Sequence, residues 1–449
     1  MGNSARVGGA ICLLSSTNTD ISVTDREFMD NSAQRSGGAV QLTLFNQFSI
    51  TTTIANINAS SFNNNRAGHG GAAIYVAQYP HLITILTSHK SNFTNNIADI
   101  GGAVSVVQVH HVIITESVFQ NNSAHRDGVV LMTDDTNVEI IRSSFTDNVA
   151  NTGGVIWTSQ NTLTINQTTF TNNRANFGGV LWAQQVTVNS HDVTLSDNSA
   201  NTDGGVFHTK QTKTTISGNT FTHNMADNNG GTMYTDEGTT NVTDSVFDHN
   251  TAGNDGGVIR SYLNEITISG GSFSSNSAEN DGGVFCTEQS NLRIIDQTLF
   301  TNNIANEGGV IWADQGTLMI VQTSFTNNAA SAGGVMWVDQ ATITSHAVNV
   351  SNNYANFSIL YLMESTTSWS SAMFSSSVGS LCAVEGTVTL TDVNMIEMQP
   401  TRQRKILALE EGGAITAFQS IIKFKGNSTL NHNRAHTAQT VTVDRECRP

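Results

Sequence analysis

Pairs of adjacent glycines recur along the chain at a nearly constant spacing, and this repeat restricts the possible folds more than any other feature. The regular pairs stand at 153–154, 178–179, 204–205, 230–231, 256–257, 282–283, 308–309 and 333–334, in steps of 25 or 26 residues. Looser pairs stand at 8–9, 37–38, 70–71, 101–102 and 412–413, and Asp-Gly fills the slot at 127–128. A short period that runs through 449 residues indicates stacked units, not separate globular domains.

The residues between the glycine pairs favour short β-strands. One strand is expected after the glycines (155–159), one near 163–167 and one around the Phe that precedes Thr-Asn-Asn, each bounded by turn residues. A leucine-rich repeat has a similar period, but its Leu-x-x-Leu-x-Leu pattern is missing. We therefore predict an all-β fold, a parallel β-helix of about 14 to 15 coils of 25–26 residues, with successive coils ~4.8 Å apart.

Alternation along the strand after the glycines predicts which side chains face inward. The second residue after each pair is apolar throughout, as in Ile156, Leu181 and Ile311, whereas the next column tolerates Gln, His and Arg and should face outward. With Asp-Gly at 127–128 taken as a pair, Val130 is expected to face inward and Leu131 outward.

Three further columns recur once per unit. A column of Phe is expected to stack inside the fold: Phe145, Phe170, Phe221, Phe247, Phe273, Phe300 and Phe325. Three residues later stands a column of Asn whose amides are expected to hydrogen-bond from coil to coil: Asn148, Asn173, Asn224, Asn250, Asn276, Asn303 and Asn328. A Gln column marks another turn: Gln108, Gln160, Gln185, Gln211, Gln289, Gln315 and Gln340. We interpret the recurring motif mainly as a folding device.

The charge of the chain excludes some partners. It has 36 acidic and 20 basic residues and a formal net charge of -16, so we expect neither nucleic acid nor an anionic membrane surface as a partner. A solubilising surface, divalent cations and a basic partner all remain compatible with this charge. No stretch reaches ~18 uninterrupted apolar residues, so this segment is not expected to insert into a membrane.

The combination of Gly-Gly-Ala-[Ile/Leu/Val] with Phe-x-x-Asn resembles the repeats of the chlamydial polymorphic outer-membrane proteins, and similar repeats occur in protist surface proteins. The tetrapeptides stand at 8–11, 37–40, 101–104 and 412–415, although most central units have Gly-Gly-Val instead. The resemblance implies a right-handed β-helix, an adhesin activity and an extracellular or cell-surface location. We expect the chain to be a segment of a longer protein.

The repeat loses its regularity near the carboxyl end. We divide the chain into regular coils (1–360), a degenerate coil with two loop insertions (361–413), and a final coil with the C-terminal segment (414–449). The Ser-rich stretch 364–380 is expected to be one loop, and 398–411, with Arg402, Arg404 and Lys405, the other. The degenerate coil is aligned so that Cys382 faces inward.

The outward column contains aromatic residues, and carboxylates follow two positions later. The aromatic residues are Trp157, Trp182, Tyr234, Trp312 and Trp337, and the carboxylates are Asp236, Glu288, Asp314 and Asp339. Such a surface suits the apolar face and hydroxyls of a sugar chain. Three interpretations stay open, namely packing between coils, sugar binding, and catalysis by Asp314 and Asp339, whose expected separation is ~5 Å.

Two weaker patterns have competing interpretations. A stripe that includes Asp203, Asp255 and Asp281 precedes the glycine pairs and either binds Ca²⁺, the one cofactor considered, or is simply solvated. Sequons for N-glycosylation stand at Asn58, Asn92, Asn121, Asn166, Asn241, Asn349, Asn356 and Asn427, either by chance or as modified sites. Of the cysteines Cys12, Cys286, Cys382 and Cys447, only Cys286 is expected to be outward and worth testing for reactivity.

The functional expectation is a cell-surface or extracellular adhesin or structural rod, not an enzyme, that acts by multivalent contacts. Its partners would be proteins or glycans of a host or neighbouring cell, and end-to-end self-association is a further expectation. The alternative is a pectin-lyase-like protein that binds or cleaves polysaccharide.

Overall fold

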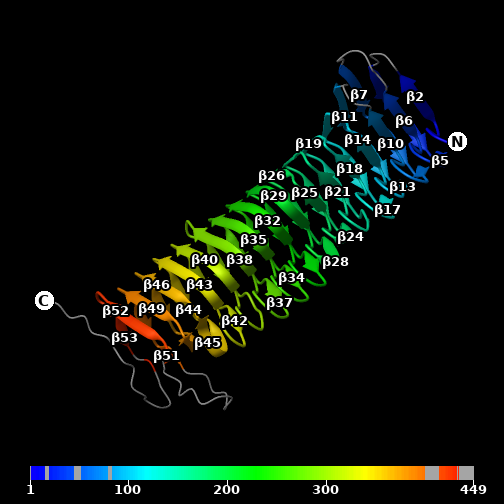
Figure 1. The fold of residues 1–449 in the computed structure, drawn as a ribbon. Coiled ribbons are helices and arrows are strands. Elements are labelled where there is room, and N and C mark those ends of the chain that lie inside the picture. The colour runs from blue at the N-terminus through cyan, green and yellow to red at the C-terminus, as the bar shows by residue number, and fades with distance from the viewer. Residues whose placement is uncertain are drawn as a thin grey trace. The chain divides into compact units, whose positions relative to one another are not determined.

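The computed structural model describes residues 2–15, 20–44, 52–78, 83–399, 414–431 and 433. Contacts divide the chain into two compact units, which are treated separately: unit 1 is Met1–Asp227 with Thr232–Tyr234, and unit 2 is Asn228–Gly231 with Thr235–Pro449. All regular structure in the described ranges is β-strand, arranged as about 14 turns of a parallel β-solenoid (Figure 1). The predicted parallel β-helix is confirmed.

The Phe residues lie on three-residue strands that pair in register from coil to coil. In unit 1 these are β4 (Glu27–Met29), β8 (Ser61–Asn63), β12 (Asn92–Thr94), β16 (Val118–Gln120), β20 (Ser144–Thr146), β23 (Thr169–Thr171), β27 (Thr194–Ser196) and β30 (Thr220–Thr222). In unit 2 they are β33 (Val246–Asp248), β36 (Ser272–Ser274), β39 (Leu299–Thr301), β41 (Ser324–Thr326), β44 (Asn349–Ser351), β47 (Met373–Ser375), β50 (Asn394–Ile396) and β53 (Thr429–Asn431). The rings of Phe119, Phe145 and Phe170 are buried and stack at centroid distances of 5.0 and 4.8 Å.

The strands that follow the glycines form the longest sheet. In unit 1 they are β2 (Ile11–Ser15), β6 (Val40–Leu44), β10 (Ile74–Gln78), β14 (Val104–Val107), β18 (Leu131–Asp134), β21 (Ile156–Ser159) and β25 (Leu181–Gln184). The next strand of each coil is β3 (Ile21–Thr24), β7 (Thr52–Asn58), β11 (Ile83–His89), β15 (His111–Thr115), β19 (Asn137–Ile141), β22 (Thr162–Asn166) and β26 (Thr187–His191). The Gln column occupies the turn between the two strands, where Gln160 and Gln185 have φ of 54° and 56°.

Further along the chain the two strands join into one strand of eleven residues. These strands are β29 (Phe207–Ser217), β32 (Met233–Thr243), β35 (Ile259–Ser269), β38 (Phe285–Ile295), β40 (Ile311–Val321) and β43 (Met336–His346). They separate again in β45 (Tyr354–Met363), β46 (Thr366–Ser370), β48 (Val378–Val384), β49 (Thr387–Thr391), β51 (Ile415–Phe418) and β52 (Ile421–Lys425). The three expected strands per coil are therefore present.

Short strands that the sequence did not predict lie where Asn-x-Ala ends the Phe corner. They are β1 (Ser4–Ala5), β5 (Ser32–Ala33), β9 (Arg66–Ala67), β13 (Ile97–Ala98), β17 (Ser123–Ala124), β24 (Arg174–Phe177), β28 (Ser199–Asp203) and β31 (Met225–Ala226), and in unit 2 β34 (Thr251–Ala252), β37 (Ser277–Ala278) and β42 (Ala329–Ala330). Most have two residues, which is too short for an alternation pattern to appear in a sequence.

The first position of each slot requires glycine because of its backbone conformation. Its φ lies between 51° and 68° in every slot from Gly8 to Gly333, a region that disfavours residues with a Cβ. In two slots this position is held by Gly71, not Gly70, and by Gly128, and the second position is Ala72 or Val129. Gly128 is therefore a first glycine, and the predicted facing in this coil is wrong by one residue. Leu131 pairs with Ile156 in the inward column, and Met132 pairs with Trp157 in the outward one.

The Asn column is a continuous buried ladder within each unit. Each Nδ2 donates to the Oδ1 of the next coil and to the Phe carbonyl of the preceding coil, as Asn148 does to Asn173 at 3.0 Å and to Phe119 at 3.1 Å. Each Oδ1 accepts from the amide and backbone N–H of the preceding Asn, so the buried group is fully paired. The ladder also contains residues that the sequence analysis missed: Asn31, Asn65, Asn96, Asn122, Asn198 and Asn353.

A second ladder, of Ser and Thr, stands two residues before the Phe column. The hydroxyl of Ser117 accepts the backbone N–H of Ser91 at 3.2 Å and donates to the carbonyl of Thr115 at 2.9 Å. Ser143 repeats this arrangement with the N–H of Ser117. These hydroxyls satisfy N–H groups at a corner where no strand partner is available.

The predicted loop at 364–380 is wrong. Strands β46, β47 and β48 form a complete coil there, because Phe374 takes the Phe position and the Ser377 hydroxyl accepts the backbone N–H of Asn353 in place of an Asn amide. The register also pairs Leu381 with Leu360, so Leu381 faces inward, and Cys382 aligns with Tyr361 in the outward column. Of the predicted loop at 398–411, residues 400–411 lie outside the described ranges, as do Arg402, Arg404 and Lys405.

Candidate functional site

The outward aromatic residues form a stack in each unit. In unit 2, β40, β43 and β45 bring Trp312, Trp337 and Tyr361 into register, with ring centroids 5.2 and 5.9 Å apart and interplanar angles of 1° and 19°. In unit 1, Trp157 and Trp182 stack at 5.2 Å. The strand register places Tyr361 in this column. The sequence analysis did not find it, because the repeat is irregular around this residue.

The stacked geometry determines which parts of these rings a sugar could contact. Stacked rings cover one another's faces, so Trp337 has a neighbour on both sides, Trp312 and Tyr361. A sugar packs its apolar side against a free ring face, and the stack leaves ring edges at its centre. Tyr234 in unit 1 likewise has His208 stacked on it at 4.9 Å. The arrangement supports packing between coils more directly than sugar binding.

A carboxylate column accompanies the aromatic residues of unit 2. Glu288, Asp314 and Asp339 pair in register on β38, β40 and β43. Burial, with the charge of Glu288, raises the pKa of Asp314, and burial, with the charges of Asp314 and Glu364, raises that of Asp339. Within the described residues, Asp339 Oδ1 and Trp312 Nε1 are buried without a hydrogen-bond partner. We name Glu288, Trp312, Asp314, Trp337, Asp339 and Tyr361 the acid–aromatic face.

Arg260 stands in the outward column two coils before Trp312. Its Nη2 donates to Oε1 of Glu288, and its Nε lies 3.9 Å from Oδ2 of Asp255. Only 14% of the side chain is exposed. Arg260 thus joins the carboxylate column to the stripe that precedes the glycines.

In unit 2 the acidic residues that precede the glycines, Asp255, Asp281 and Glu307, follow one another from coil to coil. Asp281 bridges in parallel register to Glu307, and the backbone N–H of Gly256 donates to the carbonyl of Asp281. Burial and the charges of Asp255 and Glu307 raise the pKa of Asp281 to about 7, and burial also raises that of Asp255. The three carboxylates repel one another in a partly desolvated environment, and Arg260 only partly offsets this repulsion.

The predicted calcium ligands are not assembled as one group. Among the described residues, no three His, Cys, Asp or Glu side chains are grouped so that they would hold a metal ion. The geometry therefore gives no support to a calcium site.

The prediction that Cys286 is accessible is wrong. Its side chain is 1% exposed, and burial raises its thiol pKa well above the usual value. Cys286 is aligned between Arg260 and Trp312, whose larger side chains shield a small residue in the same column. Cys382 is also buried, and burial raises its pKa to about 12. Cys12 is exposed, and Cys447 lies outside the described residues.

The sequon asparagines lie apart from the buried ladder. Asn92, Asn121, Asn349 and Asn427 are exposed, and Asn58, Asn166, Asn241 and Asn356 are partly exposed. Ladder residues cannot form sequons, because each is followed two positions later by the small Ala of the corner. None of the eight sequon asparagines is buried.

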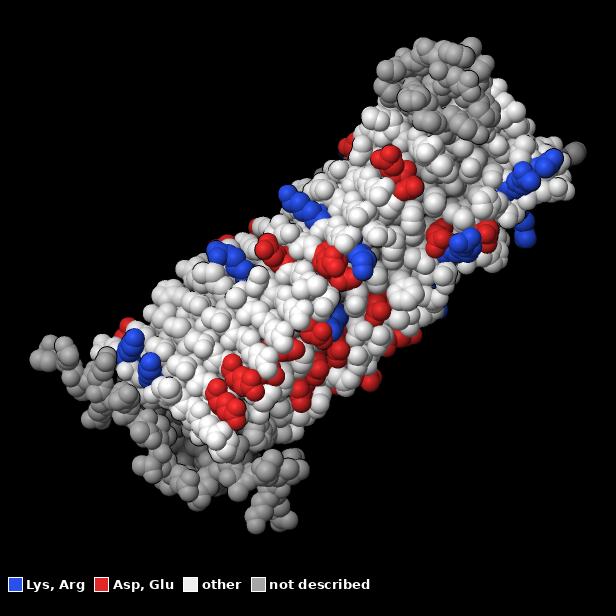
Figure 2. Space-filling view, in the orientation of Figure 1, with Lys and Arg blue, Asp and Glu red and all other residues white. Residues whose placement is uncertain are grey.

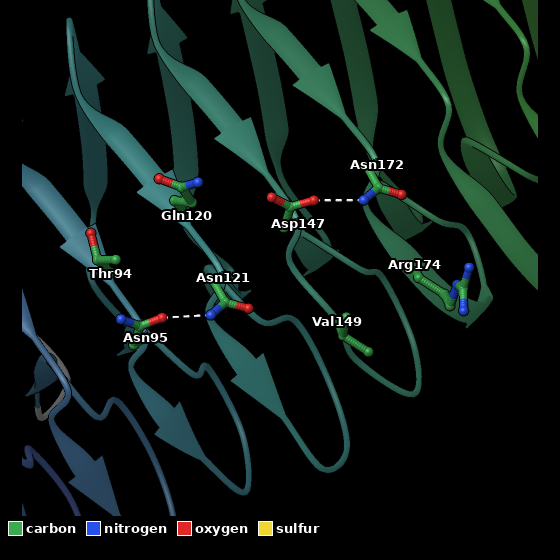
Figure 3. Close-up of a pocket in the computed structure, with 8 residues that line it drawn as sticks. All are labelled: Thr94, Asn95, Gln120, Asn121, Asp147, Val149, Asn172 and Arg174. Atoms are coloured by element: carbon green, nitrogen blue, oxygen red, sulfur yellow. Dashed lines mark hydrogen bonds between the residues drawn. The ribbon is translucent and has the colours of Figure 1, made fainter.

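A shallow groove of about 760 Å³ in unit 1 was not foreseen from the sequence (Figure 3). It is lined by Thr94, Asn95, Gln120, Asn121, Asp147, Val149, Asn172 and Arg174. Asn121 donates to Asn95, and Asn172 donates to Asp147, both at 2.5 Å. The lining is polar except for Val149, and the side chains of Asn95, Asn121, Asp147 and Asn172 form two pairs.

The fold and its columns define the class of protein, a right-handed parallel β-helix with a repeated outer surface. A family model of the right-handed β-helix region matches residues 82–247, and the Chlamydia polymorphic membrane protein repeat matches residues 59–77 and 297–314. Two segments of the chain are thus similar to the Chlamydia polymorphic membrane protein repeat, as the sequence motifs indicated. No curated protein and no solved structure gives a significant match. In the described part of the chain, no helix has the length and apolar character needed to span a membrane.

Proposed function

We propose that the chain is the β-helical part of a cell-surface adhesin or of a structural assembly at the cell surface. The observation that carries this proposal is the in-register alignment of outward side chains from coil to coil in a chain that matches the Chlamydia polymorphic membrane protein repeat. Each coil adds one side chain to each outward column at a step of ~4.8 Å. Such a surface suits many weak contacts with proteins or glycans of another cell.

Avidity supplies the physical mechanism. A single contact on an exposed polar surface is weak, but linked contacts raise the overall affinity by orders of magnitude when the spacing on both partners is compatible. The ladders of Asn and Ser keep this spacing rigid, because each coil is hydrogen-bonded through its core to the next one. Extracellular location, N-glycosylation and end-to-end self-association belong to the same proposal.

Polysaccharide binding or cleavage is the second candidate. Its support is the in-register pair Asp314 and Asp339, two aligned carboxyl groups whose pKa values are raised by burial and by neighbouring carboxylates. Against it, the columns arise from the repeat itself, and the rings beside the pair cover one another's faces.

Graded surface display tests the proposal. Beads carrying the chain at increasing density are incubated with cells and with a glycan array, and the supernatants are assayed for reducing and unsaturated sugar ends. The adhesin proposal predicts retention that rises more steeply than in proportion to density, without sugar release. Release of sugar ends would replace it with the enzymatic candidate, and an absence of retention at every density would contradict both. Negative-stain images of the free chain test self-association.

A further inference from the structure

We propose that the acid–aromatic face of unit 2 binds arginine side chains of a partner protein. This inference rests on the proposed function and names a partner for one of the repeated surfaces. Four observations carry it, namely the local charge, the contacts of Arg260, the repulsion between Asp314 and Asp339, and the geometry of the rings.

The stretch of unit 2 that contains this face is strongly acidic. Residues 235–399 contain 17 acidic residues and only two basic ones, Arg260 and Arg293, whereas residues 1–234 contain 15 acidic and 10 basic residues. Figure 2 shows acidic side chains gathered in unit 2 over the region where Figure 1 places β34, β37 and β42, with few basic ones among them. The field of such a region attracts a cationic partner.

The two arginines of this region are already engaged. Arg260 binds Glu288 and Asp255, and Arg293 donates to the sulfur of Met319. Within the described residues, neither Asp314 nor Asp339 takes part in an ion pair with a basic side chain. The carboxylate column therefore continues, in Asp314 and Asp339, for two coils beyond Glu288, which Arg260 neutralises.

Arg260 shows how the face accommodates a guanidinium. It stands in the same outward column as the tryptophans, and its fork reaches the carboxylate two positions along the next coil's strand. The equivalent carboxylates of the following coils are Asp314 and Asp339. An incoming guanidinium beside Trp312 or Trp337 meets the same kind of acceptor, and bidentate hydrogen bonds suit its planar donors.

The face also carries a repulsion that such a partner would relieve. Asp314 and Asp339 are aligned in neighbouring coils, and their carboxylates repel each other. A guanidinium supplies donors and neutralises this repulsion. The exposed edges of the stacked rings, together with Phe357, whose ring lies 5.7 Å from that of Tyr361, supply apolar contact for the methylene stem of the arginine.

Other ligands fit less well. Calcium takes 6–8 oxygen ligands, and the described residues contain no group of three acidic, His or Cys side chains arranged to hold a metal. A glycan requires a free ring face, which the stack covers at Trp337. Lysine has a point charge without a fork, so arginine is expected to bind more tightly at paired carboxylates.

The experiment measures binding of three synthetic peptides to the full chain at physiological salt. The peptides share an extended Gly/Ser sequence in which alternate residues are arginine, lysine or uncharged citrulline. The double variant Asp314→Asn/Asp339→Asn removes the two carboxylates, and Glu265→Gln/Glu279→Gln removes the same charge from exposed positions elsewhere in unit 2. Thermal melting establishes that both variants are folded.

We expect the arginine peptide to bind at least about tenfold more weakly to the Asp314/Asp339 variant, and to change less than about twofold with the control variant. We also expect the lysine peptide to bind more weakly than the arginine peptide, and the citrulline peptide not to bind. Equal losses in both variants, equal binding of lysine and arginine, or no binding of the arginine peptide would each overturn the proposal. Calcium uptake lost in the Asp314/Asp339 variant, without arginine binding, would overturn it in favour of a metal.

Bead retention separates this inference from the proposed function. If the peptide result is negative while beads still adhere in a density-dependent manner, only the arginine proposal fails. If the beads never adhere but the arginine peptide binds as expected, the arginine proposal stands and the adhesin proposal fails.

Discussion

Asn173 Oδ1 accepts two hydrogen bonds from Asn148 of the preceding coil, one from its backbone N–H at 3.1 Å and one from its side-chain Nδ2 at 3.0 Å. The same amide donates through its own Nδ2 to Phe145 O and to Asn198 Oδ1, each at 3.0 Å. One neutral side chain thereby links three coils, and it is fully buried. Stability and outer spacing in this fold both depend on such links.

Substituting Asn173→Ala should destabilise unit 1 strongly. The change removes the acceptor of the backbone N–H of Asn148 and of one of its two amide N–H groups, and each buried polar group left unpaired costs about 1–3 kcal/mol. Asn201→Ala is the matched control, because Asn201 donates to Asn176 at an exposed site. Chemical denaturation should show a clearly lower midpoint for the first variant only. Equal midpoints would mean that the ladder is not a main source of stability.

The Phe column can be tested with a substitution that the chain already contains. Phe170 pairs in register with Leu195, so leucine is compatible with this position. Phe170→Leu should cost less than about 1.5 kcal/mol, whereas Phe170→Ala should cost about 3–5 kcal/mol because it leaves a cavity. Thermal melting of both variants measures the difference. A leucine variant as unstable as the alanine variant would show that ring stacking, and not volume, is decisive.

Gly178→Ala should disrupt folding far more than Gly70→Ala. Gly178 has φ of 62°, and an added Cβ would lie 2.1 Å from the carbonyl oxygen of Leu181. At Gly70 the nearest atoms would lie 3.4 Å away and belong to side chains. Yield of soluble protein and melting temperature report the effect. Comparable behaviour of the two variants would contradict the requirement for the first glycine of each slot.

Asp281 should make stability depend on pH. Its pKa is raised from the usual 3.8 to about 7, so between these values the folded state holds a proton that the unfolded state releases. Stability contributed by this site therefore falls as pH rises towards and through 7. Asp281→Asn should melt at a higher temperature than the wild type at pH 8, and the gap should shrink at pH 5. Glu279→Gln, at an exposed position, should show no such trend.

Thiol labelling tests the burial of Cys286. With the native chain, a thiol reagent should modify exposed Cys12 rapidly, and Cys286 and Cys382 only after denaturation. Both buried thiols have raised pKa values, which lower the fraction of reactive thiolate. Peptide mass spectrometry assigns the labelled sites. Rapid native labelling of Cys286 would show that Arg260 and Trp312 do not shield it.

Much of the fold was predictable because one period runs through the chain. Residues 25 or 26 apart must occupy equivalent places, so apolar, Phe, Asn and Gly columns reveal the core and corners without any structure. The prediction failed where the period changes. Counting from Asp127-Gly128 shifted Leu131 by one place, and the shortened coil after Asn353 hid the positions of Phe374, Tyr361 and Cys382.

The sequence by itself determined the parallel β-helix, the stacking of like residues and the side of the sheet on which Trp312, Trp337, Asp314 and Asp339 lie. Only the tertiary structure decided that Cys286 is buried, that the tryptophans cover each other's faces, and that Asp281 carries a raised pKa. The physical reason is that facing follows from alternation along one strand, which is local. Burial, ring geometry and electrostatic repulsion depend on the size and charge of side chains in the coils before and after. The sequence of a single repeat does not contain this information.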